Sequence, residues 1–444
     1  MSVTETPFHH GSHQDLLSSP ARPAPAGPAP GGPGIDAIIV PTARRPVYIA
    51  EASALAQALG CTLVTLHSGK WTTAGMLAER MPPEIDLVAI DIRESDLLRL
   101  PDWETSALLA GTVFATRTDL SAKRNLALVL SHMLGWERIL FLDDDITALN
   151  PHDVRRASSL LGSYNAVGLQ IGGFPDNSVV CHAYRQAGGR QSSFVGGGAL
   201  IVEVKATNGY NSFFPDIYNE DWFFLLDGDK RLLPTTTTGR VNQNRYDPFR
   251  TPDRARGEEL GDVLAEGIYW LLDQGQSIQD ADSWHWDDFI AKRRQFITKV
   301  LAMLAEHELP PAEKTRRVEA LKGSLGRLAL IKPDLCESYL RAWTRDRQAW
   351  RRHLEQLPID VGRVQALGEL TRPGSPGLTW HFGQRADAAR RPAGALSWAL
   401  EDLAGHGYLD LRELQKPRDP SDDREKVLQL SGRRPVVTGS ARQR

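Results

Sequence analysis

The chain has few cysteines and no long apolar run. Only Cys61, Cys181 and Cys336 occur in 444 residues, far apart and odd in number, which argues against a disulfide framework and favours a reducing compartment. No stretch approaches the roughly 18 consecutive apolar residues of a membrane span. Residues 1–34 also lack a basic start followed by an apolar core. We therefore expect a cytoplasmic protein without a membrane span.

A strong charge of one sign is also missing. The chain carries 52 Lys and Arg against 55 Asp and Glu, a formal net charge of −3. A balanced composition provides no broad electrostatic field for nucleic acid or an anionic membrane. We therefore expect no nucleic-acid partner, and the partners must be recognised by a local site.

Both ends of the chain are predicted to be disordered tails. Residues 1–34 are rich in Pro, Ala and Gly, and residues 416–444 in Pro, Ser, Asp and Arg, so neither segment has enough apolar side chains to bury. His9, His10 and His13 lie in the first tail, where we expect ordinary polar residues and no metal site.

The rest of the chain predicts two regions. Residues 35–275 alternate between β-rich and helical patterns, which predicts an α/β domain with a mostly parallel sheet. Residues 276–415 show mainly helical spacing and predict an extension packed on that domain. The expected early elements are strands at 35–40, 61–66, 85–92 and 139–142 and helices at 47–59, 73–80 and 121–135.

The segment Ile139–Asp145 is the most informative of the chain. Four apolar residues predict a strand buried on both faces, and three consecutive aspartates follow it. Ligands bind at the carboxyl ends of strands in open α/β sheets. Crowded carboxylates resist ionising together, so sharing a hard divalent cation is their least costly use.

The helix predicted before this strand has positively charged residues in its first turn, which is unusual. Ser121 is a candidate N-cap, yet Lys123 and Arg124 follow in the first turn, where the helix dipole favours acids. Cations there become useful if an anion such as a phosphate binds over the exposed backbone N–H groups. Asn125 adds an amide that donates and accepts. Together with the aspartates, this predicts a site for a metal-bridged diphosphate.

Several segments resemble the GT-A glycosyltransferases, in particular the large inverting family, over roughly residues 35–270. The matching segments, in chain order, are Ile38–Thr42 with Arg44, Arg45 and Pro46, then Lys123–Asn125, Leu142–Asp145 (Leu-Asp-x-Asp), Ser193–Val202 with its three glycines, and Asn219–Trp222 (Glu-Asp). The resemblance implies a GT-A fold, a nucleotide-diphosphate sugar as donor, a hydroxyl acceptor, and Mn²⁺ or Mg²⁺ as cofactor.

The resemblance also implies roles for single residues. Asp221 would be the base that takes the acceptor proton, with Glu220 orienting the acceptor or replacing Asp221 as base. Asp143 and Asp145 would hold the metal, with His285 as a third ligand. The donor would contact Pro41, Thr42, Arg44, Lys123, Arg124, Asn125, Asp143, Asp144, Gly197 and Gly198.

Two other functions stay open. Ile139–Leu149 also fits the haloacid dehalogenase-like pattern, with Asp143 as a phosphate-accepting nucleophile and Asp145 as acid/base. That motif belongs on a first strand, however, and here at least two βα units precede it. A nucleotide-sugar mutase would use a triple-Asp metal site on the same fold. Hydrolysis of the sugar nucleotide without an acceptor, compared with hydrolysis of a generic phosphate ester, separates a transferase from a phosphatase, and direct isomerisation of the donor would identify a mutase.

Overall fold

The computed structural model describes residues 13–18, 34–93, 98–116, 118–174, 178–191, 194–204, 212–227, 231–374 and 377–383. The strands are β1 (Ala37–Thr42), β2 (Thr62–His67), β3 (Leu87–Asp91), β4 (Arg138–Leu142), β5 (Ile146–Thr147), β6 (Ala166–Gly173), β7 (Ala199–Glu203), β8 (Leu226–Asp227), β9 (Arg231–Leu232), β10 (Thr235–Gln243) and β11 (Thr379–Phe382). The α-helices are α1 (Ala50–Leu59), α2 (Ala74–Arg80), α3 (Glu104–Leu109), α4 (Leu120–Met133), α5 (Pro151–Leu160), α6 (Val179–Gln186), α7 (Glu220–Phe224), α8 (Pro252–Asp273), α9 (Ser283–Glu306), α10 (Pro311–Leu328), α11 (Pro333–Glu355) and α12 (Arg363–Gly368). Short 3-10 helices are η1 (Gln14–Leu16), η2 (Pro46–Ile49) and η4 (Ile278–Asp280).

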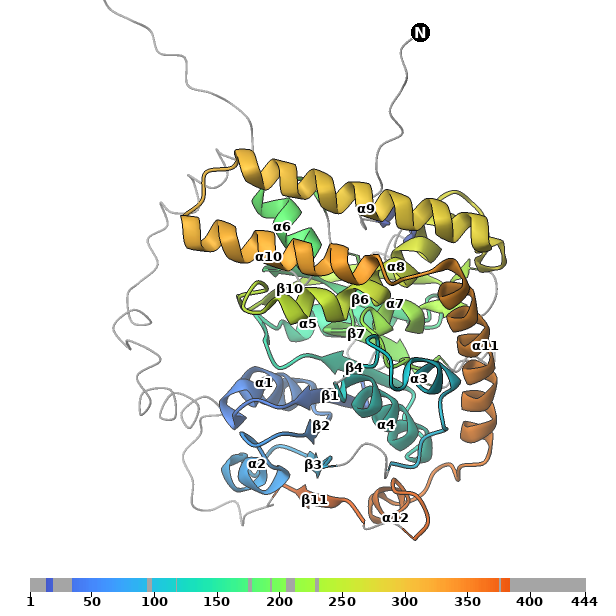
Figure 1. Cartoon of the computed structure of the whole chain (residues 1–444). Helices are drawn as coiled ribbons and strands as arrows, with labels where there is room; N and C mark the ends of the chain where they lie inside the picture. Colours follow the sequence, from blue (N-terminus) through green and yellow to red (C-terminus); the bar gives the residue numbers. More distant parts are fainter. Residues whose placement is uncertain are drawn as a thin grey trace, which may run out of the picture.

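A mixed sheet forms the centre of the molecule (Figure 1). Within the described residues it has nine strands in the order β11-β3-β2-β1-β4-β7-β6-β10-β5, and β8 pairs with β9 separately. The strands β3, β2, β1 and β4 run parallel to one another, as the βαβ alternation predicts. The early elements therefore agree with expectation to within a few residues at their ends.

The prediction of a mostly parallel sheet is confirmed only in part. Beyond β4, the strands β6 and β10 pair in parallel and run in the same direction as β4, but antiparallel strands join the sheet as well. The strand β7 lies antiparallel between β4 and β6, and β5 and β11 are antiparallel to β10 and β3. Parallel neighbours need a crossover connection that carries the chain back to the same end of the sheet. A strand that follows without such a crossover runs antiparallel to its neighbour. Hydrophobic periodicity marks a strand but does not give its direction, so this half of the sheet could not be derived from the alternation.

The core lies on both faces of the sheet. On β4, Leu140 belongs to an apolar cluster with residues of α1, α2 and α5, whereas Phe141 belongs to a second cluster with residues of α4 and α8 to α11. Both side chains are fully buried. Consecutive residues point to opposite faces because a strand has a period of two. This confirms that the apolar run before the aspartates is a strand buried on both faces.

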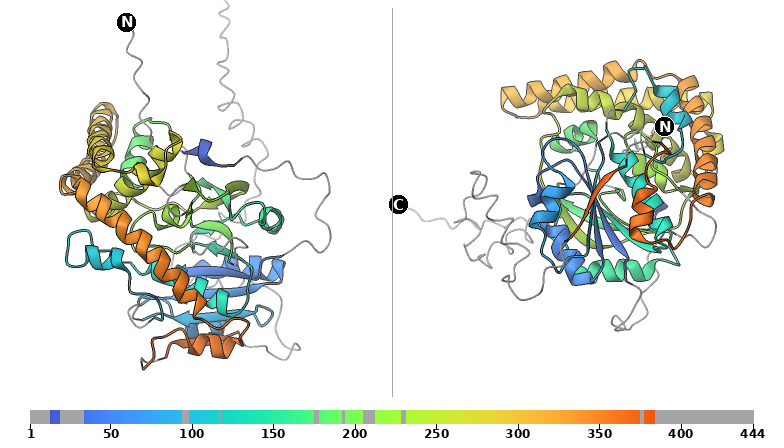
Figure 2. Two further views of the ribbon diagram at one scale, coloured as in Figure 1. Left: turned by 90° about the vertical axis from the view of Figure 1, so that its right-hand side faces the viewer. Right: turned by 90° about the horizontal axis from the view of Figure 1, so that it is seen from below.

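The region after residue 276 is helical only in part. The helices α9 and α10 lie together at one end of the molecule, and α11 runs from them along its side (Figures 1 and 2). The chain then returns to the sheet, where β11 pairs with β3. The expected helical extension thus ends in a strand of the main sheet, and residues 384–415 lie outside the described part.

The N-terminal segment differs from the prediction at one place. Residues 13–18 include η1 beside α8, and the His13 side chain is buried. The expectation that His13 is a stray polar residue of a tail is therefore wrong. His9, His10 and residues 416–444 lie outside the described residues. None of the described helices is long and apolar enough to cross a membrane.

Candidate functional site

Two cavities meet at the carboxyl end of β4. The larger one has a volume of about 640 Å³ and is lined by all three aspartates that follow β4. The smaller one has a volume of about 160 Å³ and is lined by Glu220 and Asp221. Asp143, Leu120 and Gln243 line both cavities. A ligand in one cavity therefore lies next to a ligand in the other across Asp143.

The loop after β1 forms one wall of the larger cavity and holds the aspartates. Thr42 Oγ1 donates to Asp144 Oδ2 at 2.7 Å. The guanidinium of Arg44 lies 3.2 Å from both Asp144 Oδ1 and Asp145 Oδ2. Burial raises the pKa of Asp144 to about 6 although Arg44 and Thr42 oppose it, and burial also raises the pKa of Asp145. The predicted donor residues Pro41, Thr42, Arg44, Asp143 and Asp144 all line this cavity.

The aspartates match the ligand chemistry of a hard divalent cation in part. Asp145 Oδ1 is buried and has no hydrogen-bond partner among the described residues, and such an oxygen is costly to leave without a partner. Among the described residues, however, no three His, Cys, Asp or Glu side chains are grouped to hold an ion by themselves. A cation here would need Asp143 or Asp145 together with oxygens of a bound ligand.

The start of α4 differs from the prediction in detail. The N-cap is Asp119 and not Ser121, whose hydroxyl donates to the Pro215 carbonyl. Lys123 lines the larger cavity, but its Nζ donates to Thr42 O at 3.1 Å and Ser68 Oγ at 2.6 Å and lies 3.1 Å from Asp119 Oδ1. Burial lowers the pKa of Lys123. A buried ammonium needs such partners. Lys123 therefore stabilises the wall of the cavity and is not directed to a ligand inside it.

Arg124 links the two cavities. Its Nη2 donates to Asp143 Oδ1 at 2.9 Å, and its Nη1 donates to Glu220 Oε1. The side chain is buried, so both bonds form in a low-dielectric environment where a charged pair is strong only with good geometry. The guanidinium of Arg124 thus bridges Asp143 after β4 and Glu220 at the start of α7.

The glycine loop before β7 allows this close approach. A Cβ on Gly197 would lie 2.6 Å from Arg124 Nη1, and a Cβ on Gly198 would lie 2.9 Å from Asp143 Oδ2. The Asp143 N–H donates to Gly198 O at 2.9 Å. These two predicted glycines therefore lie at the site, where side chains of any other type would collide with the charged groups.

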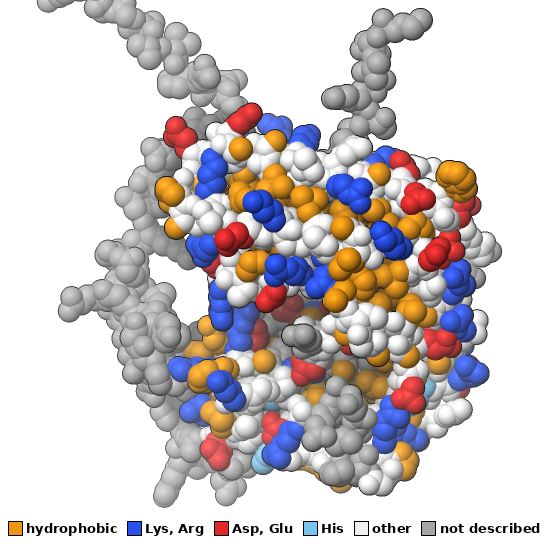
Figure 3. Space-filling view, in the orientation of Figure 1, with side chains coloured by type: hydrophobic (Ala, Val, Ile, Leu, Met, Phe, Trp, Pro, Cys, Tyr) orange, Lys and Arg blue, Asp and Glu red, His pale blue; other side chains and the backbone are white. Residues whose placement is uncertain are grey.

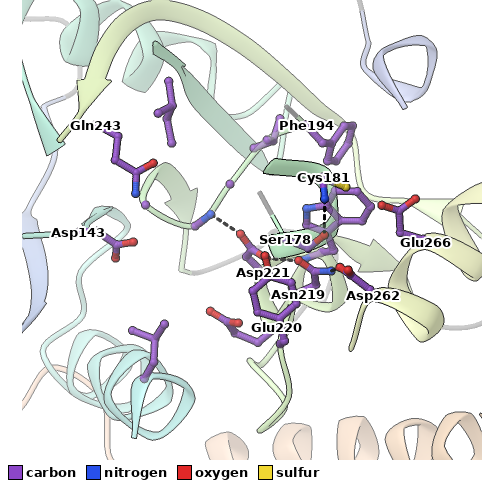
Figure 4. A pocket seen from close by; sticks show the side chains of 18 of the residues that line it. Asp143, Ser178, Cys181, Phe194, Asn219, Glu220, Asp221, Gln243, Asp262 and Glu266 are labelled. Atoms are coloured by element: carbon purple, nitrogen blue, oxygen red, sulfur yellow. Dashed lines mark hydrogen bonds between the residues drawn. The ribbon is translucent and has the colours of Figure 1, made fainter. Parts of the chain in front are cut away.

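Glu220 and Asp221 project from the first turn of α7 into the smaller cavity (Figure 4). Asp221 Oδ2 accepts from the Gly197 N–H at 2.6 Å, and its Oδ1 accepts from the Trp222 N–H at 3.0 Å. Burial raises the pKa of both carboxyls, while the charge of Arg124 lowers it. Such bonds fix the orientation of Asp221 and favour its ionised form, which leaves a basic carboxylate at the cavity.

The contribution of α8 to the opposite wall of the smaller cavity was not predicted. Its Asp262 and Glu266 lie beyond Asp221 in Figure 4, and Phe194 and Trp222, from two of the segments matched in the sequence, complete this wall. Asp262 Oδ1 accepts from Asn219 at 3.0 Å, and its Oδ2 accepts from Arg293 at 2.5 Å. The acids at positions 258, 262 and 266 of α8 are one turn apart and so share a face of the helix, and this spacing was the available sequence signal.

Two predicted site residues point elsewhere. Asn125 is buried and lines neither cavity, because its amide donates to Phe214 O and accepts from Phe214 N–H, each at 2.8 Å. His285 lies in the first turn of α9 with its ring against Trp286 and Phe289, and it also lines neither cavity. Neither side chain is available to the aspartates in this arrangement, so we withdraw the proposed roles of Asn125 as donor contact and His285 as metal ligand.

The larger cavity has a second wall, formed after β10. The segment between β10 and α8 contributes Tyr246, Asp247 and Arg250, and the first turn of α8 contributes Arg254. Arg254 donates to Tyr246 Oη at 2.9 Å and to Glu258 Oε1 at 2.6 Å. These arginines come to the cavity from a segment that carries no recognisable phosphate-binding motif, so tertiary packing alone brings them there.

Comparisons with known proteins add little. No protein-family profile and no curated protein matches the chain. Among solved structures it is similar to the mannosyltransferase PcManGT from Pyrobaculum calidifontis in complex with GDP-Man and Mn²⁺, with 16% identity and a TM-score of 0.38, over 77% of this chain and 91% of that chain. A similarity of this degree carries no argument about activity, so the interpretation depends on the residues of this chain.

Proposed function

We propose that the chain is a metal-dependent glycosyltransferase of the GT-A type, which transfers a hexosyl group from a nucleotide-diphosphate sugar to an acceptor hydroxyl. The observation that carries the proposal is the pair of cavities that meet at Asp143. One cavity combines clustered carboxylates with arginines, as a metal-bridged diphosphate requires, and the other contains an oriented, buried carboxylate.

The donor occupies the larger cavity in this proposal. Asp143 and Asp145 hold Mn²⁺ or Mg²⁺, which, when bound, neutralises charge on the leaving diphosphate. Arg44, with a side chain 43% exposed, is able to move from Asp144 and Asp145 toward a phosphate. Arg250 and Arg254 add positive charge on the opposite wall. Guanidinium groups suit phosphate oxygens because they bind them through two parallel N–H donors.

The acceptor occupies the smaller cavity. Asp221 takes the proton of the acceptor hydroxyl as that oxygen attacks the anomeric carbon, and the two N–H donors hold its carboxylate in place. Glu220, bonded to Arg124, keeps the geometry between the two cavities. Direct displacement in this arrangement inverts the anomeric configuration.

The first test is metal-dependent nucleotide binding. A panel of nucleoside diphosphates and their sugars, with and without Mn²⁺, is expected to raise the melting temperature, because a ligand that binds only the folded state stabilises it by about 2.7 kcal/mol at 100 times its Kd. In Asp143→Asn and Asp145→Asn the Mn²⁺-dependent part of this shift should vanish. The control is Asp102→Asn, at an exposed carboxylate paired with Arg372 on the surface.

Three outcomes would contradict the proposal. Unchanged Mn²⁺-dependent binding in both aspartate variants would remove the metal site. Hydrolysis of a simple phosphate ester, without any sugar nucleotide, would instead support the phosphatase function, and isomerisation of the donor would support a mutase.

A further inference from the structure

His13 lies in a pocket that has the composition of a cation-binding site. Its imidazole is surrounded by five side chains, which we call the aromatic cage: Phe194, Trp222, Tyr269, Glu266 and Asp273. The ring of His13 lies 5.3 Å from that of Trp222 and 5.2 Å from that of Tyr269, in edge-to-face geometry. The three cage rings also contact one another, with centroids 4.6 to 5.3 Å apart.

The two carboxylates of the aromatic cage face the nitrogens of this ring. His13 Nδ1 is hydrogen-bonded to Asp273, and His13 Nε2 lies 3.9 Å from Glu266 Oε2. Burial lowers the pKa of His13, but the two carboxylates outweigh burial and raise it above its usual value. The cage therefore stabilises positive charge on a nitrogen among aromatic rings, as sites for ammonium ligands do.

The aromatic cage shares a wall with the smaller cavity. Phe194, Trp222 and Glu266 belong to both, and Trp222 directly follows Asp221 in α7. Tyr269 Oη donates to the Trp222 carbonyl at 3.0 Å, which ties the cage to the first turn of that helix. A nitrogen in the cage would thus be part of a ligand whose other end reaches the candidate base.

The cavity is small while His13 is in place. Its volume of about 160 Å³ is below the roughly 300–1,000 Å³ of ordinary ligand pockets. Departure of the imidazole would enlarge it at the wall formed by Phe194, Trp222 and Glu266. The small volume of the cavity is therefore consistent with departure of the segment that carries His13 before an acceptor binds.

The segment that carries His13 has other contacts as well, and its Leu16 and Leu17 pack against the apolar core. His13 itself has a left-handed backbone, with φ 39° and ψ 23°, which is unfavourable for a residue with a side chain. Beyond the ring, the Ser18 N–H donates to Thr235 O at 3.0 Å and Thr236 Oγ1 donates to Ser18 O at 2.9 Å. The contacts of the imidazole must offset the backbone strain, so a competing ligand of the cage would release it.

We propose that the aromatic cage is the subsite for a positively charged nitrogen on the acceptor, and that His13 is an internal ligand that occupies it until the acceptor binds. The acceptor class is accordingly a small hydroxyl compound with an amine or quaternary ammonium group. The role of this ligand as an acceptor rests on the proposed transferase function, whereas the cation site itself does not.

The test compares two probes of the same shape. Choline carries a quaternary ammonium group and a hydroxyl, and 3,3-dimethylbutan-1-ol is its neutral carbon analogue. Binding to the full chain is measured by calorimetry without nucleotide or metal. We expect His13→Ala to bind choline at least tenfold more tightly than the neutral analogue, and at least tenfold more tightly than the unsubstituted chain does. His152→Ala, at an exposed histidine, serves as the control and should bind like the unsubstituted chain.

Further variants keep the test decisive. His13→Gln, which retains size but not charge, replaces His13→Ala if the latter does not fold. Asp273→Asn added to His13→Ala should weaken choline binding at least tenfold. Equal affinity of His13→Ala for both probes, or no choline binding, would overturn the cation site. If choline binds as expected but no sugar nucleotide supports transfer to any hydroxyl, the proposed function fails and the cation site stands.

Discussion

The two cavities that meet at Asp143 are built in different ways. The larger one is lined by charged groups from several segments, including the partly exposed Arg44 after β1, the three consecutive aspartates after β4, and Arg250 and Arg254 from the region after β10. The smaller one is narrow, and its carboxylate is held by backbone N–H groups from a glycine loop. The first arrangement suits a mobile charged ligand that brings its own cation, and the second suits a group that must be oriented before a proton moves.

Exposure of charge follows the same division. This holds for the arginines but not for every charge: Arg44 in the larger cavity remains 43% exposed and Arg124 at the smaller cavity is only 2% exposed, whereas Lys123, which also lines the larger cavity, is buried. On the face shown in Figure 3, acidic and basic side chains are interspersed without a large field of one sign. The charges that would recognise a ligand are therefore those of the two cavities that meet at Asp143.

The largest effect is expected at the base. Asp221→Asn keeps the shape of the side chain but removes the acceptor of the proton, so turnover should fall by about 10²- to 10⁴-fold. Donor binding should persist, because the larger cavity is untouched. Steady-state kinetics and nucleotide binding measured on Asp221→Asn and Glu220→Gln separate the two acids. A severe loss in Glu220→Gln with near-normal turnover in Asp221→Asn would exchange their roles.

A smaller effect should distinguish two neighbouring glycines. A Cβ on Gly197 would lie 2.6 Å from Arg124 Nη1 and 3.0 Å from Asp221 Cβ, but a Cβ on Gly196 would meet nothing closer than 3.7 Å. Gly197→Ala should therefore cost about 1–3 kcal/mol of stability, the usual cost of overpacking, and reduce turnover by displacing Asp221. Gly196→Ala is the matched control. Melting temperatures and rates of the two variants provide the comparison, and equal behaviour would show that the close approach at Gly197 is unimportant.

The smallest effect is a displacement of the pH profile. Because burial raises the pKa of Asp221 and Glu220, the base is protonated at a higher pH than an exposed carboxylate would be. Activity should be present above the raised pKa and fall as the pH is lowered through it, by about tenfold per unit. We expect kcat/KM against pH to show this acid limb above the usual carboxylate range near pH 4. A limb at pH 4 would mean that the base is solvated.

Local patterns predicted one half of the site and missed the other. Asp143, Asp144 and Asp145 could be found because they directly follow an apolar run, and strand ends are where ligands bind. Asn125 was assigned to the ligand because it lies beside Lys123 and Arg124, yet its amide binds the backbone of Phe214 and lines neither cavity. Residues adjacent in a helix face different directions, so adjacency alone cannot assign a common role.

The sequence by itself determined the parallel part of the sheet, the buried strand and the aspartates that end it, because these follow from apolar periodicity within one segment. Only the tertiary structure decided the antiparallel strands, the return of β11 to β3, and the meeting of Arg124 with Glu220 across 96 positions of the chain. It also decided that His13, in a segment of tail-like composition, is buried among the rings beside α8. The physical reason is that such contacts depend on which surfaces pack together, and side-chain chemistry within one segment does not encode that choice.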